Sequence, residues 1–161
     1  MKVGVLMGSD SDWPILKPAA ALLKSFGIES EVAVASAHRT PGKVRDFVCA
    51  AEEKEIGAFI VAAGAAAHLA GVVASYTTLP VIGIPVNATP LNGMDALLAT
   101  VQMPSGVPVA TMAVNGAKNA AILAVEIFAV SDKGLRGKLM DYRKKMAEDV
   151  EKKAARVAAQ L

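Results

Sequence analysis

Short apolar runs alternate with segments of helical periodicity along most of the chain. Residues 2–7 form a valine-rich run that predicts a buried strand, and Gly8 ends it. Between Pro14 and Phe26 the apolar positions recur at helical spacing, and Gly27 follows as a stop signal. The same alternation predicts strands at residues 2–7, 28–35, 58–63, 79–85 and 107–114, and helices at residues 14–26, 40–56, 69–75, 92–102 and 117–130.

The C-terminal segment, residues 135–161, has a different pattern. One apolar stripe runs from Leu135 to Leu161, and lysines, arginines and glutamates fill the other faces of a long predicted helix. Because the stripe is narrow, two interpretations stay open. The helix packs on its own domain, or it is an arm that reaches a neighbouring subunit.

Strands that alternate with helices predict one architecture. Consecutive strands joined through helices run parallel, with right-handed crossovers. The expected fold class is α/β, a three-layer doubly wound parallel sheet that is flavodoxin-like, with a long C-terminal helix. No repeat, linker or low-complexity stretch interrupts the sequence, so residues 1–161 are expected to form a single domain with a C-terminal helical arm at about 135–161.

The composition favours a protein that associates with copies of itself. Hydrophobic residues make up 53% of the chain and its mean hydropathy is +0.41, which fits a membrane protein or a subunit of a soluble oligomer. Glycine, proline or charge interrupts every apolar stretch before the roughly 20 residues that a spanning helix needs. The run before Gly8 is also too short for a signal peptide. We therefore expect a homo-oligomer and no membrane association.

Charge and cysteine content indicate which partners are not expected and in which compartment the protein works. The formal net charge is +2, and no basic patch interleaved with aromatic side chains occurs, so nucleic acid is not expected as a partner. Cys49 is the single cysteine and cannot form an internal disulfide. We expect it to be a small core residue of a helix, which is consistent with a reducing cytoplasm.

Polar residues gather directly after the first three predicted strands. The segments are residues 8–12 (Gly-Ser-Asp-Ser-Asp), residues 36–41 (Ser-Ala-His-Arg-Thr-Pro) and residues 64–68 (Gly-Ala-Ala-Ala-His). In an open α/β sheet, ligands bind outside the carboxyl ends of the strands. These three segments are therefore the candidate site, and both histidines of the chain fall within them.

The first segment suits a phosphorylated ligand. Gly8 permits a sharp turn, and hydroxyls beside free helix N-terminal amides can hold a phosphate. Ser9 taken alone is better explained as a helix cap. Asp10 and Asp12 would repel a phosphate, so one of them is better placed on ribose hydroxyls.

The second segment carries the sharper chemistry. Arg39 offers a planar fork that suits phosphate or carboxylate. The imidazole of His38 can act as a general acid–base. For His68, in the third segment, contact with ligand and a role in fastening the turn both stay open.

Several other chemistries are not indicated. No Gly-x-Ser-x-Gly elbow or Walker motif occurs, so neither a serine nucleophile nor ATP use is expected. With two histidines and no clustered carboxylates, a metal site is not expected either. The residues thus predict a phosphorylated small molecule and a histidine acid–base, and they do not identify the substrate.

At these same residues the chain closely resembles the class I N5-carboxyaminoimidazole ribonucleotide mutase family, the catalytic subunit of phosphoribosylaminoimidazole carboxylase. The matching segments keep the order of the family and are residues 7–13 (MGSDSDW), 36–41 (SAHRTP), 66–69 (AAHL), 79–83 (LPVIG), 102–104 (QMP), 106–110 (GVPVA) and 119–120 (NA).

The resemblance implies an activity and an assembly. It implies that the enzyme rearranges N5-carboxyaminoimidazole ribonucleotide to the C4-carboxylated isomer in purine biosynthesis, by decarboxylation and recarboxylation, without metal, ATP or biotin. The implied subunit is flavodoxin-like and belongs to a cytoplasmic homo-octamer whose active sites are completed by neighbouring subunits.

The resemblance also implies roles for individual residues. His38 is the implied general acid–base. The other residues bind the substrate: Ser9, Asp12 and Arg39 at the ribose phosphate end with Ser11 and Ser36 nearby, and Gly64, Ala65, Ala66, His68 and Leu69 over the base and the travelling carboxylate. The apolar run Ala65–Ala67 suits carbon dioxide, which is uncharged.

The chain departs from the family pattern in the third segment. Alanine stands at positions 62 and 65, where glycine is usual, and Ala70 replaces a usual proline. Alanine disfavours backbone angles that glycine permits. Two alternatives stay beside the mutase. One is a related carboxylase that fixes free carbon dioxide onto aminoimidazole ribonucleotide, and the other, supported only by this altered loop, is a non-catalytic ribonucleotide-binding module.

Overall fold

The computed structural model describes residues 1–160, so Leu161, the last position of the predicted stripe, lies outside the described residues. Residues Met1–Ala124 form one compact unit, and the chain from Val125 onward forms a second. The elements are β1 (Lys2–Met7), the 3-10 helix η1 (Asp10–Asp12), α1 (Trp13–Phe26), β2 (Glu29–Val34), α2 (Pro41–Cys49), β3 (Ile56–Gly64), α3 (Leu69–Ser75), β4 (Val81–Val86), α4 (Met94–Val101), β5 (Ala110–Thr111), α5 (Ala117–Ala129) and α6 (Lys133–Ala158).

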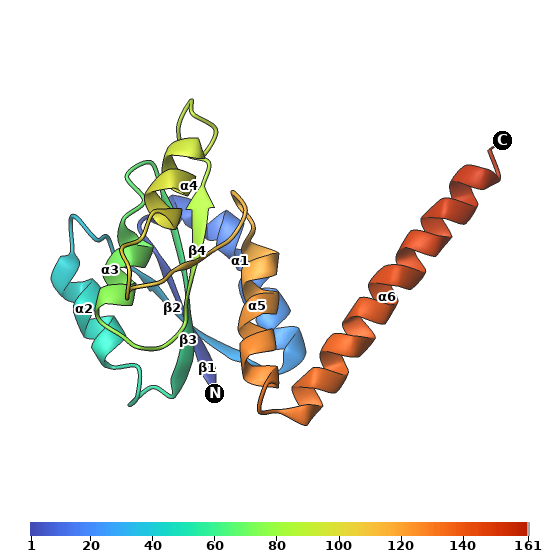
Figure 1. The fold of residues 1–161 in the computed structure, drawn as a ribbon, viewed down its shortest axis with the longest axis horizontal. Helices are drawn as coiled ribbons and strands as arrows, with labels where there is room; N and C mark the ends of the chain where they lie inside the picture. The colour runs from blue at the N-terminus through green and yellow to red at the C-terminus, as the bar shows by residue number, and fades with distance from the viewer. Residues whose placement is uncertain (161) are drawn as a thin grey trace. The chain divides into compact units, whose positions relative to one another are not determined.

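The sheet has five parallel strands in the order β2-β1-β3-β4-β5. This is the flavodoxin-like order, in which the chain reverses direction across the sheet between β1 and β3. Helices α2, α3 and α4 cover one face, and α1 with the first part of α5 covers the other (Figure 1). The predicted three-layer α/β fold is therefore confirmed.

The core lies on both faces of β1, β3 and β4. Every residue of β4 is buried, as expected for a central strand with helices on both sides. Between the sheet and helices α2 and α3, large side chains such as Leu6, Phe59 and Val73 are fully buried. Gly4 makes room for this packing, since a Cβ there would lie 2.6 Å from the Phe59 ring.

Two predicted elements end earlier than expected. Helix α2 stops at Cys49 instead of near Ile56, because turns follow and Glu55 takes a left-handed backbone with φ 57°. Cys49 is exposed at this end, so its expected place in the core was wrong. Strand β5 keeps only Ala110–Thr111 of the predicted residues 107–114, and Pro108, which has no N–H to donate, precedes it.

The second unit holds the long helix α6. Asp132 caps its start, because the carboxylate accepts hydrogen bonds from the N–H groups of Gly134 (2.8 Å) and Leu135 (3.0 Å). Leu135 and Leu139 are buried, whereas the apolar side chains Met146 and Val150 are exposed. Among the described helices, none is both long enough and apolar enough to cross a bilayer.

Candidate active site

Strand register brings the predicted segments to one edge of the sheet. Met7, the last residue of β1, lies opposite Val34 of β2 and Ala62 of β3. Gly64, at the end of β3, lies opposite Val86 of β4. The residues that follow these four strands therefore meet at the carboxyl edge, as parallel pairing requires.

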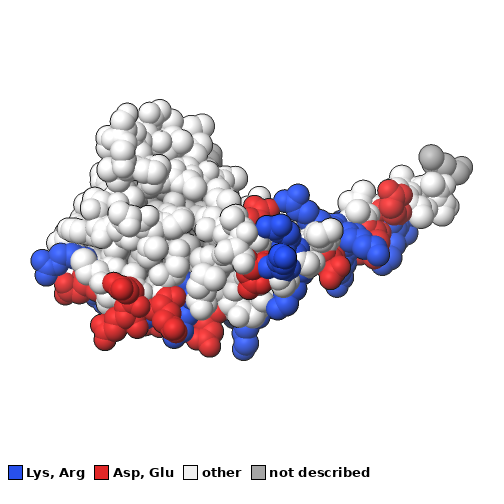
Figure 2. All heavy atoms as spheres, turned by 60° about the horizontal axis from the view of Figure 1, so that its bottom comes forward, with Lys and Arg blue, Asp and Glu red and all other residues white. Residues whose placement is uncertain are grey.

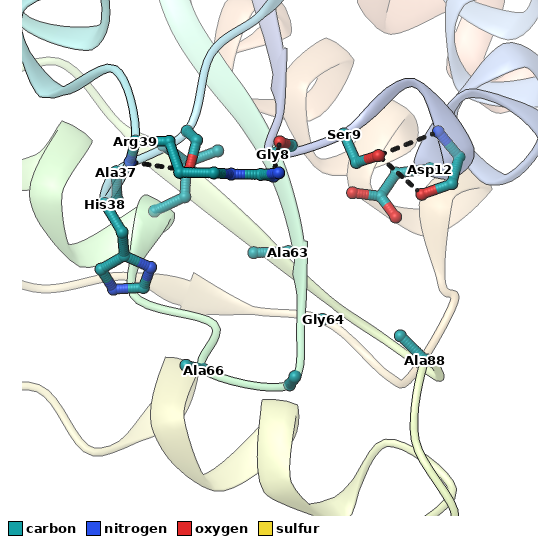
Figure 3. A pocket seen from close by; sticks show the side chains of 14 residues that line it. Gly8, Ser9, Asp12, Ala37, His38, Arg39, Ala63, Gly64, Ala66 and Ala88 are labelled. Atoms are coloured by element: carbon teal, nitrogen blue, oxygen red, sulfur yellow. Dashed lines mark hydrogen bonds between the residues drawn. The ribbon is translucent and has the colours of Figure 1, made fainter.

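A cavity of about 230 Å³ lies between these segments (Figure 3). Ten of the predicted site residues line it: Ser9, Ser11, Asp12, Ser36, His38, Arg39, Gly64, Ala65, Ala66 and Leu69. The lining also includes Gly8, Ala37, Ala63 and Ala88. His68 and Ala67 are not part of the lining, and Ala67 is fully buried, so its expected place beside the ligand was wrong.

Ala88 is the lining residue farthest from any predicted segment. It follows β4, and the rule that led to the other three segments applies equally to this strand. The sequence offered no polar side chain at this position to attract notice. A search after every strand end, polar or not, would have found it.

The segment after β1 is organised by Ser9. This residue caps η1, and its Oγ accepts hydrogen bonds from the N–H of Ser11 (3.3 Å) and from Ser11 Oγ (2.9 Å). The interpretation of Ser9 as a cap is confirmed. Gly8 lies in a bend, as predicted, but its φ is not positive and a Cβ there would have open space around it, so this bend does not require glycine.

Asp12 is the buried charged group of the site, with 8% of its surface exposed. Burial raises the pKa of its carboxyl, because the ion loses water, and the nearby charge of Asp10 acts in the same direction. Hydrogen bonding to Ser9 and Ser11 lowers the pKa and offsets part of this. The carboxylate is an acceptor that can hold ligand hydroxyls.

Arg39 spans two of the strand-end segments. Its Nη2 donates to the carbonyl of Gly8 (3.2 Å), and its Nε donates to Ser36 Oγ (3.4 Å). Within residues 1–160, no carboxylate forms an ion pair with this guanidinium. A cation placed in this way at a cavity is a suitable partner for a phosphate or a carboxylate.

The two histidines of the chain touch each other. Nε2 of His38 lies 2.9 Å from Nδ1 of His68, and the rings meet edge to face with centroids 5.0 Å apart. His38 also lines the cavity. Both sequence interpretations of His68, ligand contact or fastening of the turn, missed this partner.

The segment after β3 combines a glycine and an unusual alanine. A Cβ at Gly64 would lie 2.7 Å from the Cβ of Ala88, so only glycine fits between these strand ends. Ala65 has φ 52°, in the left-handed region that L-residues with a Cβ avoid. The turn therefore keeps a glycine-like backbone at a position where this chain has alanine.

No group of three or more His, Cys, Asp or Glu side chains within residues 1–160 is arranged to hold a metal ion. The polar groups at the cavity are one imidazole, one guanidinium, one buried carboxylate and the hydroxyls of Ser9, Ser11 and Ser36. These groups suit acid–base chemistry on a bound organic ligand.

Known proteins match most of this chain in sequence. The family model described as AIR carboxylase matches residues 2–149. The chain is 50% identical to the N5-carboxyaminoimidazole ribonucleotide mutase of Pyrococcus horikoshii, over 96% of this chain and 88% of the relative. It is also 50% identical to the N5-carboxyaminoimidazole ribonucleotide mutase of Thermotoga maritima, over 97% of this chain and 91% of the relative.

Solved structures share the whole fold. A variant of Treponema denticola PurE2 superposes with a TM-score of 0.86 at 30% identity, covering 97% of this chain and 98% of that one. Treponema denticola PurE superposes with a TM-score of 0.83 at 31% identity, covering 93% of this chain and 94% of that one. The likeness therefore extends over sequence and fold together.

Proposed function

Because the chain belongs to the AIR carboxylase family, we propose that it is an N5-carboxyaminoimidazole ribonucleotide mutase, an isomerase of purine biosynthesis. The observation that carries this proposal is one cavity that combines the His38 imidazole, the Arg39 guanidinium and a lining of alanines and glycine. The alternatives, fixation of free carbon dioxide and ribonucleotide binding without catalysis, are not favoured by relatives that are mutases at 50% identity.

The polar side of the cavity accounts for substrate binding. Arg39 supplies a cation for the phosphate, with the hydroxyls of Ser9, Ser11 and Ser36 as further partners. Asp12 accepts hydrogen bonds from the ribose hydroxyls, a task for which an ionised carboxylate is suited. These assignments place the base toward His38 and the segment after β3.

The reaction starts with loss of carbon dioxide from the carbamate. The bond between the exocyclic nitrogen and the carboxyl carbon breaks, and the nitrogen takes a proton from protonated His38. Carbon dioxide is then held beside the ring by the small apolar surfaces of Ala63, Ala66 and Ala88. Confinement replaces a dilute bimolecular encounter with a local one, which is a large entropic advantage.

The second half restores the aromatic ring. C4 of the imidazole attacks carbon dioxide, so that this carbon carries both a hydrogen and a carboxylate. Neutral His38 removes that hydrogen as a proton and returns to its protonated form. One histidine therefore serves both steps, and no proton is gained or lost over the cycle.

A paired-substrate assay tests the function. The protein is given N5-carboxyaminoimidazole ribonucleotide in one reaction, and aminoimidazole ribonucleotide with bicarbonate in the other. We expect efficient turnover of the carbamate. Efficient turnover of aminoimidazole ribonucleotide alone would identify the carboxylase instead, and binding of ribonucleotide without turnover would identify the binding module.

His38→Asn is the matched variant for this assay. It should fold and bind ribonucleotide as the wild type does, and its turnover should fall by at least ~100-fold, the lower end of what general acid–base catalysis contributes. Near-normal turnover in this variant would remove His38 from the catalytic role.

The assembly and compartment are part of the same proposal. We propose a single mutase domain that forms a cytoplasmic homo-oligomer, an octamer as the family resemblance implies. Leu91, Met94, Leu98 and Val101, here called the α4 stripe, are large apolar side chains with 46–63% of their surface exposed. On the face that Figure 2 shows, charged side chains gather at one edge of residues 1–124 and along α6, and a broad part of that face is uncharged. Surfaces of this kind favour association.

A further inference from the structure

The contact between His38 and His68 joins the segment after β2 to the start of α3. His38 lines the cavity and His68 does not, although Nε2 of the first lies 2.9 Å from Nδ1 of the second. His68 is the N-cap residue of α3, and its side chain makes no cap hydrogen bond there. An effect of His68 on the chemistry therefore passes through His38.

Two ring nitrogens at this distance share one hydrogen. In the first arrangement His38 carries its hydrogen on Nε2 and donates it to Nδ1 of His68. In the second arrangement His68 carries the hydrogen on Nδ1 and donates it to Nε2 of His38. Two hydrogens between the rings would repel each other. With no hydrogen between them, the lone pairs of the two nitrogens would face and repel each other. The contact therefore couples the tautomers of both rings.

Only one of these two arrangements allows His38 to accept a proton from the substrate. Because His68 occupies Nε2, the nitrogen of His38 left for the substrate is Nδ1, and the ring reaches toward the cavity (Figure 3). In the first arrangement Nδ1 of the neutral ring is bare and can accept a proton. In the second arrangement Nδ1 already carries a hydrogen and cannot remove one from the substrate.

We propose that His68 is a positioning residue that holds His38 in the first arrangement. Neutral His68, with its own hydrogen on Nε2, accepts from Nε2–H of His38 throughout the cycle. Nδ1 of His38 gives its proton to the exocyclic nitrogen as carbon dioxide leaves, and later takes the proton from C4. His68 itself neither gains nor loses a proton during the cycle. This inference rests on the proposed mutase function for its chemistry, but the tautomer itself can be measured without substrate.

Nitrogen-15 NMR of the imidazole rings tests the tautomer. The chain has two histidines, so the full-length protein without a histidine tag gives two ring systems, which His68→Asn assigns. At a pH where both rings are neutral, His38 should show a protonated, pyrrole-type Nε2 and a bare, pyridine-type Nδ1. A protonated Nδ1 on His38 would overturn the proposal, whatever the substrate is.

Steady-state kinetics test the consequence. His68→Ala should lower kcat by ~10- to 100-fold, by analogy with the loss of partners that orient metal-bound histidines, with KM nearly unchanged. His68→Phe keeps an aromatic ring but has no hydrogen-bond acceptor, so its kcat should be as low as that of His68→Ala. His68→Asn offers an amide oxygen to Nε2–H and should recover most of the rate.

The controls separate this inference from the function on which it rests. Thermal unfolding and ribonucleotide binding of each variant show whether the fold and the cavity are intact. Wild-type kcat in folded His68→Phe would contradict the positioning role. Failure of the wild type to convert the carbamate would contradict the proposed function instead, and the NMR result would still decide the tautomer.

Discussion

At the residue scale, burial of Asp12 couples the stability of the fold to pH. Its carboxyl is buried beside η1, and burial raises its pKa above the ordinary aspartate value. The folded chain therefore binds a proton at Asp12 more tightly than the unfolded chain does. By linkage, this residue favours folding below the ordinary aspartate pKa, and that contribution is lost as the pH rises through the raised value.

Asp12→Asn should accordingly raise the free energy of unfolding at pH 7, because the amide carries no charge to desolvate. The gain over wild type should shrink at pH 4, where the wild-type carboxyl is more protonated. Urea unfolding of both proteins at the two pH values measures this. Asp141→Asn is the matched control, since Asp141 is exposed on α6 and does not act on the pKa of Asp12, and it should keep the pH dependence of the wild type. An equal gain at both pH values would contradict the linkage.

Residue types and their places after the strands predicted that several polar side chains would meet at one edge of the sheet. The residue types at positions 9, 12, 38 and 39 indicated caps, hydroxyl binding and proton transfer, and the structure places all four around one cavity. Burial of Asp12 could not be predicted, because the sequence does not show which side of η1 is covered. The partner of His68 was missed for a similar reason, since it lies in another segment.

At the scale of elements, the turn from β3 to α3 contains a residue whose side chain does not suit its backbone conformation. Gly64 is held by close approach to Ala88, and Ala65 then takes φ 52°. A left-handed backbone costs an L-residue roughly 1–2 kcal/mol relative to glycine. Alanine at position 65 therefore holds a backbone conformation that glycine would adopt at lower cost.

Ala65→Gly should stabilise the protein by about 1 kcal/mol, because relief at a positive φ exceeds the extra entropy that glycine has in the unfolded chain. Ala66→Gly is the matched control. Ala66 has no positive φ, so glycine there should be neutral or destabilising by about 0.4–1 kcal/mol. Chemical denaturation of the three proteins gives the comparison. A loss of stability in Ala65→Gly would show that the turn carries no strain at this position.

Element boundaries were predicted unevenly, and the reason is local. Strands β1 and β3 lie close to their predicted ranges, since each is a buried apolar run. The end of α2 and the length of β5 were wrong, because a left-handed Glu55 and the sheet pairing of residues 110–111 depend on contacts beyond the local pattern.

At the scale of the whole molecule, charge is distributed unevenly along the chain. Between Gly57 and Ala117 the sequence has one charged residue, Asp95. The α4 stripe lies within this stretch, and its side chains are exposed in the single chain. An uncharged surface with exposed large apolar groups is the reason we expect association of identical subunits.

Light scattering at several protein concentrations should give a mass of eight times the 16.6 kDa of one chain. Leu98→Lys places a charge in the centre of the α4 stripe and should lower that mass. Asp46→Lys puts the same side chain on the exposed face of α2 and should leave the mass unchanged. A concentration-independent mass of 16.6 kDa for the wild type would contradict the oligomer.

The sequence by itself determined the class of fold and the edge of the sheet at which the site lies. Hydrophobic periodicity is local, and parallel strands place their carboxyl ends together wherever helices connect them. Tertiary structure alone decided which side chains from different segments touch. The pairing of His38 with His68 and the approach of Gly64 to Ala88 depend on strand register and turn geometry. Those arise only when the distant segments pack together, so no local pattern encodes them.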